Sequence, residues 1–186
     1  MKKLNNYIVE AWSGVKKQSH EQEIKLWCEE MRIQNYTINS KGEIDVDGFV
    51  NLDNKSKFKE LPYKFGKVTG NFSLISCINL ISLKNCPNEV GGYFNCAYCN
   101  NLKSIVGSPS YVGEDFACSY CPQLDSLEGC PKKIEDSFYC HGCKSLDSLE
   151  GCPKKVGGDF WCVDCKRKFT KEEVMSLCKV TKDIFV

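Results

Sequence analysis

The sequence has no long hydrophobic run, no excess of charge of one sign and only two histidines among its 186 residues. No segment approaches the roughly 20 consecutive apolar residues that span a bilayer, so we expect no membrane partner. Because 25 Lys and Arg residues balance 24 Asp and Glu residues, the net charge of +1 gives no general electrostatic reason to bind nucleic acid. These absences leave a chain long enough for one ordinary domain with its own core.

Catalytic motifs are missing as well. Neither His20 nor His141 lies in a recognisable nucleophile motif, and the chain contains neither a P-loop nor a dinucleotide fingerprint. His141 lies next to Cys140, but its position in the repeat described below varies from copy to copy, which favours a solvent-facing residue over a catalytic one. We therefore expect a protein that is not an enzyme and that uses no cofactor.

Cysteine is the residue that the sequence has in excess, with 14 copies. Such a content is typical of small secreted proteins with disulfides, but the first residues lack the apolar stretch of a signal peptide. We therefore expect a cytoplasmic protein whose thiols are reduced. Since clustered thiols in a reducing compartment usually bind metal or act in catalysis, the cysteines need an explanation of their own.

A strict 22-residue repeat accounts for most of the chain. The consensus reads V-G-G-x-F-x-C-x-x-C-x-x-L-x-S-L-E-G-C-P-K-K, and a degenerate copy before it brings the total to about six turns. Gly and Pro interrupt every copy before a helix of usual length could form, whereas the F-x-C alternation favours a strand. The phenylalanines that define the period are Phe72, Phe94, Phe116, Phe138 and Phe160.

One brief strand per repeat cannot bury its apolar face alone. The copies are therefore expected to stack with their strands parallel and in register, about 4.8 Å apart, so that equivalent residues form ladders along the stack. This pattern predicts a parallel β-solenoid.

Residues 44 to 166 resemble leucine-rich repeats, particularly the short bacterial kind. Phe116 and Cys118 occupy the inward Leu positions of the strand, Cys121 takes the usual Asn or Cys place, and two leucines follow. The resemblance implies an α+β repeat protein, a single-stack leucine-rich-repeat-like parallel β-solenoid with short helical caps. The phrase SLEGCPKKVGG is also similar to repeat proteins encoded by bacteria and their large tailed phages, which for a phage protein implies action in the host cytoplasm.

A solenoid exposes an apolar layer at each end, and both ends of this chain have candidate caps. We expect a helical and hairpin cap at residues 1–42, the solenoid at 43–166 and a helical cap at 167–186. Strands at 36–38 and 44–46 would form the hairpin, and a capping box from Thr170 to Glu173 would begin the C-terminal helix. Two N-terminal amphipathic helices are indicated by Leu4, Tyr7, Ile8, Ala11 and Trp12, and by Ile24, Trp27, Cys28 and Met31.

Four C-x-x-C pairs recur once per repeat, at Cys96/Cys99, Cys118/Cys121, Cys140/Cys143 and Cys162/Cys165. Taken alone, this spacing is typical of zinc ribbons. The register favours another interpretation, since Leu52 and Leu74 continue the first cysteine column and Ser108 interrupts a further one. Cysteine that alternates with leucine is typical of apolar filling, so we favour buried ladders over zinc, with disulfides as a third alternative.

Four columns of residues around the inward Phe and Cys positions are expected to be exposed. They vary between copies and carry aromatic residues of the types that dominate interface hot spots. Asp115, Asp159 and Asp164 lie among them and argue against a face that binds duplex nucleic acid. The columns hold Asn71, Tyr93, Asp115, Ser137 and Asp159; Ser73, Asn95, Ala117, Tyr139 and Trp161; Ile75, Ala97, Ser119, His141 and Val163; and Ser76, Tyr98, Tyr120, Gly142 and Asp164.

The sequence therefore predicts a protein-protein interaction module that binds a partner protein through its strand-lined face. The phage resemblance implies an inhibitor or adaptor that acts on a host protein. Two alternatives stay open: a zinc-binding structural module, and a structural subunit of a larger assembly such as a virion, in which the caps make the contacts. The aromatic residues could also shield neighbouring turns. The candidate partner-binding residues are Tyr93, Tyr98, Asp115, Tyr120, Tyr139, His141, Asp159 and Trp161.

Overall fold

The computed structural model describes residues 19–186. The chain divides into two compact units, Met1–Arg32 and Ile33–Val186, which are described separately. The helix predicted around Leu4 to Trp12 lies outside the described residues. The described part of the first unit is helix α2 (His20–Met31), which confirms the second amphipathic helix predicted in this region.

Helix α2 begins and ends with two local signals. Ser19 accepts a hydrogen bond from the backbone N–H of Gln22, whose side chain accepts one from the Ser19 N–H, so two backbone donors at the helix start are satisfied. Arg32 ends the helix in the left-handed conformation, with a φ of 59°. The apolar residues at helical spacing, Ile24, Trp27, Cys28 and Met31, are all buried.

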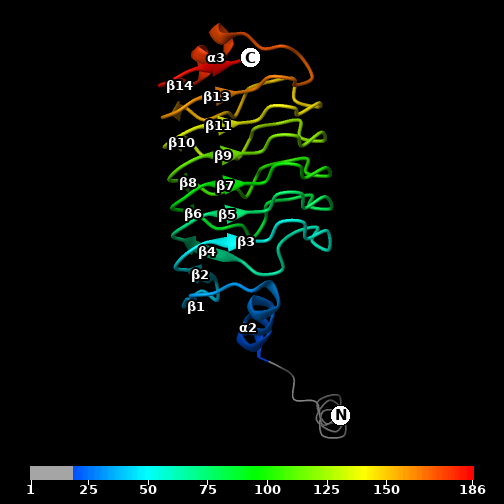
Figure 1. Cartoon of the computed structure of the whole chain (residues 1–186), viewed down its shortest axis with the longest axis vertical. Helices are drawn as coiled ribbons and strands as arrows, with labels where there is room; N and C mark the ends of the chain where they lie inside the picture. The colour runs from blue at the N-terminus through cyan, green and yellow to red at the C-terminus, as the bar shows by residue number, and fades with distance from the viewer. Residues whose placement is uncertain (1–18) are drawn as a thin grey trace, which may run out of the picture. The chain divides into compact units, whose positions relative to one another are not determined.

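The second unit is a parallel β-solenoid of about six turns, which confirms the stacked repeat (Figure 1). The predicted hairpin is present: β1 (Tyr36–Ile38) pairs antiparallel with β2 (Ile44–Val46), and β2 then pairs parallel with the first full turn. All later pairings are parallel. The eight-stranded sheet continues with β4 (Phe65–Val68), β6 (Glu89–Val90), β8 (Tyr111–Val112), β10 (Lys133–Ile134), β12 (Lys155–Val156) and β14 (Lys179–Val180).

A second sheet runs beside the first, so the expectation of one strand per turn was wrong. It is seven-stranded and consists of β3 (Val50–Asn51), β5 (Phe72–Ser73), β7 (Phe94–Asn95), β9 (Phe116–Ala117), β11 (Phe138–Tyr139), β13 (Phe160–Trp161) and β15 (Ile184–Phe185). The two strands of a turn are joined by a short corner that contains the repeated glycines. A Cβ at Gly91 would collide with the carbonyl oxygen of Thr69 in the turn before, so the corners can stack closely only without a side chain there.

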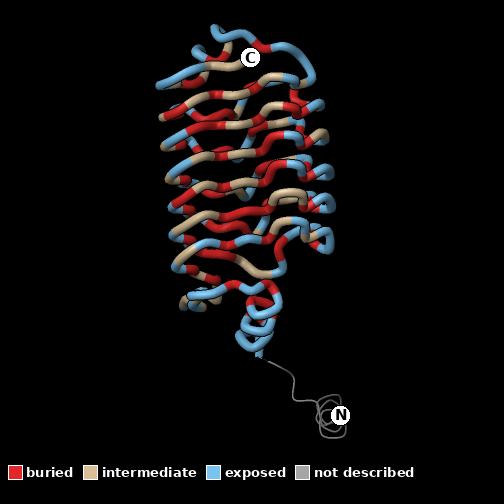
Figure 2. Tube along the Cα trace, in the orientation of Figure 1, coloured by how far each residue is buried: buried red, intermediate tan, exposed pale blue. Residues whose placement is uncertain are grey.

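The register of both sheets follows the 22-residue period. Phe94 pairs with Phe116 in the seven-stranded sheet, and Val90 pairs with Val112 in the eight-stranded sheet. The phenylalanine rings form a continuous buried ladder, with ring centroids 5.3 Å apart from Phe94 to Phe116 and 5.9 Å apart from Phe116 to Phe138. Buried residues therefore recur at the same places in successive turns (Figure 2).

The cysteines form buried ladders, as the register predicts. All 14 thiols are free, and only Cys165 is partly exposed. The second thiol of each C-x-x-C pair donates a hydrogen bond to a main-chain carbonyl of the preceding turn: Cys121 Sγ to Cys96 O at 3.3 Å, and Cys143 Sγ to Cys118 O at 3.3 Å. Burial raises the pKa of Cys121 and Cys143 to about 12, so both remain protonated donors at neutral pH.

The C-terminal segment contains more than the predicted helix. Helix α3 (Lys171–Leu177) begins with the expected capping box between Thr170 and Glu173. After the helix, β14 and β15 extend both sheets by one further pair of strands. The segment predicted as a helical cap is thus one short helix followed by a continuation of the solenoid. In residues 19–186 no helix has the length and apolar character needed to cross a membrane.

Candidate functional site

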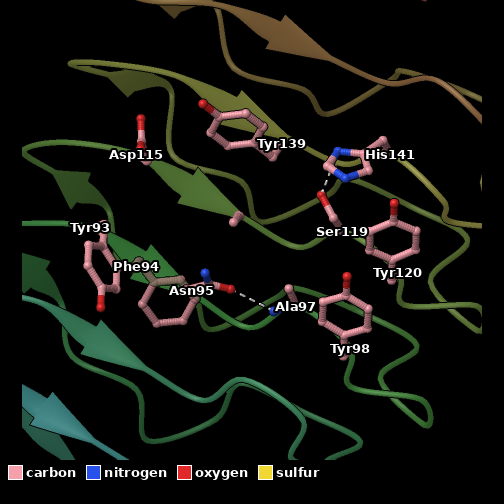
Figure 3. Close-up of a pocket in the computed structure, with 11 residues that line it drawn as sticks. Tyr93, Phe94, Asn95, Ala97, Tyr98, Asp115, Ser119, Tyr120, Tyr139 and His141 are labelled. Atoms are coloured by element: carbon pink, nitrogen blue, oxygen red, sulfur yellow. Dashed lines mark hydrogen bonds between the residues drawn. The ribbon is translucent and has the colours of Figure 1, made fainter. Parts of the chain in front are cut away.

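A cavity of about 400 Å³ opens on the face of the seven-stranded sheet, across three successive turns. It lies over β7, β9 and β11 and the bends that follow them (Figure 3). Its lining consists of Tyr93, Phe94, Asn95, Ala97, Tyr98, Asp115, Ala117, Ser119, Tyr120, Tyr139 and His141. The lining is therefore mostly aromatic or small, with one carboxylate.

The cavity exists because small side chains occupy its centre. Ala97, Ala117 and Ser119 hold positions where the following turns carry larger residues: Ala117 stands in the column of Tyr139, and Ser119 in the column of His141. Side chains of neighbouring turns in one column lie about 4.8 Å apart, so a small residue leaves a hollow that the next turn does not fill. The floor is thus set by side-chain size within an otherwise uniform stack.

One wall is formed by two tyrosines in an unusual backbone conformation. Tyr98 and Tyr120 have φ values of 60° and 55°, and their rings stack with centroids 4.7 Å apart. Both side chains remain well exposed, at 48% and 41%. The next residue of the column is Gly142, where an added Cβ would collide with the Tyr120 ring, so the glycine makes room for that ring.

His141 joins this wall to the top of the cavity. Its Nδ1 lies 3.0 Å from the hydroxyl of the buried Ser119, and its ring packs edge-on against Tyr120 with centroids 4.8 Å apart. The Tyr139 ring also packs edge-on against the His141 ring, with centroids 6.3 Å apart. Burial lowers the pKa of His141, and the neighbouring carboxylate of Asp164 offsets this only in part. The imidazole is therefore neutral at pH 7 and packs edge-on against the rings of Tyr120 and Tyr139.

Asp115 is the one carboxylate residue in the lining of the cavity. Its Oδ1 accepts a hydrogen bond of 2.9 Å from the backbone N–H of Ser137 in the next turn. Burial is the main cause that raises the pKa of Asp115, and the carboxylates of Asp136 and Asp159 raise it further. In Figure 3, Asp115 and Tyr93 lie across the cavity from Tyr98 and Tyr120. The carboxylate thus borders an aromatic surface.

Six of the eight candidate partner-binding residues line this cavity: Tyr93, Tyr98, Asp115, Tyr120, Tyr139 and His141. Asp159 and Trp161 do not, because the C-terminal strands engage them. Trp161 stacks on Phe185 with ring centroids 3.7 Å apart, and Asp159 Oδ1 accepts a hydrogen bond from the backbone N–H of Asp183 at 3.0 Å.

The expected exposure of the four columns was wrong at several positions. The structure buries Ser73, Ala97, Ser119, Ser137 and Gly142, because larger side chains of neighbouring turns cover them or their hydroxyls bond within the stack. The cavity residues Phe94, Asn95, Ala97, Ala117 and Ser119 were not among the candidates. A signal was present in the sequence, since small residues surrounded by large ones in aligned repeats mark a hollow.

The thiols of the C-x-x-C pairs are arranged for contacts with the main chain. Within residues 19–186, no group of three or more His, Cys, Asp or Glu side chains is arranged so that it could hold a metal ion. The thiols instead meet main-chain carbonyls, as in the bond of 3.4 Å from Cys165 Sγ to Cys140 O.

The fold and the cavity together define a parallel β-solenoid with an aromatic hollow on one of its two sheets. No protein-family model matches the chain. Neither a curated protein nor a solved structure matches it.

Proposed function

We propose that the protein is a binding module that engages a partner protein through the face of the seven-stranded sheet, centred on the cavity between Tyr93 and His141. Partner side chains would enter the hollow above Ala117, while the surrounding tyrosines supply the contact area. Tyrosine suits this role because it offers a large, amphipathic surface at a low cost in conformational entropy.

The observation that carries the proposal is the backbone conformation of Tyr98 and Tyr120. Every residue of their column that lies in a complete turn has a positive φ, and the other turns place small or polar residues there: Asn54, Ser76, Gly142 and Asp164. Asn, Asp and Gly tolerate the left-handed region best, whereas a bulky residue in it costs about 1 to 3 kcal/mol. Two exposed tyrosines at such positions do not serve the stability of the stack, which supports a role in binding.

We also propose a repeat class, end caps, a compartment and a kind of target for this solenoid. We place the solenoid with the leucine-rich repeats, supported by Cys121, which donates to the main chain of the preceding turn at the place where those repeats carry Asn or Cys. The α2 and α3 segments would act as end caps. Free thiols throughout the described chain support a reducing compartment such as the cytoplasm. Action on a host protein, as inhibitor or adaptor, rests on the likeness of the repeat phrase alone.

Selection from a displayed peptide library tests the proposal while the partner is still unidentified. The variant Ala117→Trp should fill the hollow, and we expect the fold to accept this side chain because Trp161 occupies the same column in another turn. We expect selected peptides to bind the wild type and to lose roughly tenfold or more in affinity for Ala117→Trp, since hot-spot contacts cluster in such hollows.

The matched control is Tyr111→Ala, which removes an exposed tyrosine from the eight-stranded sheet instead. Peptides that bind this variant as tightly as the wild type, but not Ala117→Trp, support the proposed face. Peptides that bind Ala117→Trp and the wild type equally would overturn it.

A further inference from the structure

The charge of the cavity lining has one sign. Asp115 is its only residue ionised at pH 7, since His141 is neutral there and none of the lining residues is a lysine or arginine. Lys182 is a cation whose charge acts on Asp115, and its Nζ lies 3.6 Å from Asp136 Oδ1 in an ion pair. The cavity therefore offers an incoming group a carboxylate that has no cationic partner within the lining.

The aromatic lining of the cavity, like its carboxylate, suits a positively charged group. Tyr93 and Tyr139 lie nearer to Asp115, whereas Tyr98 and Tyr120 lie on the far side of the cavity (Figure 3). The faces of aromatic rings attract cations within about 6 Å of the ring centroid, and this attraction strengthens where water is partly excluded. A cavity lined by one carboxylate and four tyrosines thus favours a cation over an anion or a neutral group.

We infer that the cavity binds the side chain of an arginine presented by the partner, with its guanidinium against Asp115 and its methylene groups over Ala117. This inference rests on the proposed function and specifies the group that it recognises. A planar guanidinium can stack on tyrosine faces while it donates to a carboxylate, whereas the ammonium of lysine is compact and more strongly hydrated. Arginine is therefore preferred to lysine.

Small probes test this directly. The wild-type protein is titrated with N-acetyl-arginine-N-methylamide, with the citrulline analogue and with the lysine analogue, while the amide resonances of Ala97, Ala117 and Ser119 are followed by NMR. Citrulline has nearly the shape of arginine but no charge. We expect the arginine probe to shift these resonances with an affinity about tenfold higher than the citrulline probe, and the lysine probe to lie between them.

Asp115→Asn is the matched variant. Asn71, in the same column, already accepts a hydrogen bond from the N–H of Tyr93 through its side chain at 3.1 Å, as Asp115 does with Ser137, so the substitution keeps a bond that the fold uses. A thermal melt checks that the variant is folded. We expect it to bind the arginine probe about tenfold more weakly and to lose the difference between arginine and citrulline.

Two results would overturn the inference: equal binding of arginine and citrulline to the wild type, or equal binding of arginine to the wild type and Asp115→Asn. Its failure can be separated from that of the proposed function. Library peptides that require the open Ala117 hollow but lack arginine would leave the binding face in place and remove only the arginine assignment. Peptides insensitive to Ala117→Trp would remove the face itself.

Discussion

The middle turns and the last turn of the seven-stranded sheet carry the same four columns of residues, yet they form different surfaces. In the middle, Tyr98, Tyr120 and Tyr139 stand around small residues and enclose the cavity. In the last turn, Trp161 is covered by Phe185, and its indole Nε1 is buried with no acceptor among the described residues. An aromatic residue in a variable column therefore stays available at the surface only where the neighbouring turn leaves it uncovered.

The largest expected effect concerns the phenylalanine ladder that both regions share. Phe116→Ala, under the cavity, and Phe160→Ala, under the last turn, should each lower the free energy of unfolding by about 3 to 5 kcal/mol, because both rings are fully buried. Urea unfolding monitored by circular dichroism measures this. A much smaller loss for Phe160→Ala would show that the last turn is not part of the same cooperative core.

Trp161→Ala should separate stability from binding. We expect a loss of about 1 to 3 kcal/mol, because the contact with Phe185 disappears, and no change in the affinity of cavity-directed peptides. Trp161→Phe serves as the control: it keeps an aromatic partner for Phe185 and removes the unpaired indole donor, so stability should be nearly retained. Loss of peptide binding in Trp161→Ala at a temperature where it is folded would place Trp161 in the binding surface after all.

Tyr98→Asn, in the middle turns, should weaken peptide binding and leave stability nearly unchanged. The change copies Asn54 and relieves the left-handed strain, which offsets the lost stacking on Tyr120. We expect the free energy of unfolding to stay within about 1 kcal/mol of the wild type, while peptide affinity falls severalfold. Thermal and urea unfolding, together with titration of a selected peptide, check both parts. A loss of stability as large as that of Trp161→Ala would mean that Tyr98 is structural.

The smallest effect is a pH dependence that comes from His141. Because burial lowers its folded pKa below the ordinary 6.5, the unfolded chain binds a proton that the folded chain does not. The stabilising contribution is fully present above about pH 7 and is lost as the pH falls through about 6.5 towards the folded pKa. His141→Val copies Val163 from the last turn, so its stability should depend less on pH between about 5 and 7. Parallel slopes for the two proteins would contradict this assignment.

Much of the fold follows from the repeat. The spacing of Phe94 and Phe116 predicts their pairing, because a parallel ladder without insertions can only align equivalent residues. The hairpin at 36–46 and the capping box at Thr170 likewise depend on local residue types. The second strand of each turn escaped prediction because its inward residue, such as Ile134, has no apolar residue two positions away, whereas Phe138 and Cys140 make an alternating pattern.

The sequence predicted only part of the cavity lining. Six lining residues were predicted from their aromatic or charged side chains, but the hollow itself depends on Ala97 and Ala117, whose role is the space that they leave. The covering of Trp161 was not predictable from the period, since Phe160 pairs with Ile184, whereas the period would bring Lys182 opposite it. A contact made outside the repeat register leaves no trace in the repeat.

The thiol ladder gives the stack a direction. Each second thiol of the C-x-x-C pairs donates to a carbonyl in the turn before it, so a middle turn receives a donor from its successor and supplies one to its predecessor. If a duplicated repeat were inserted between two turns, its thiol would donate to a carbonyl of the turn before it. Its own carbonyl would accept from the thiol of the turn after it. Recombination within the gene could thus lengthen or shorten the solenoid in whole turns without breaking the ladder, and would change the number of turns between Ala117 and one end of the stack.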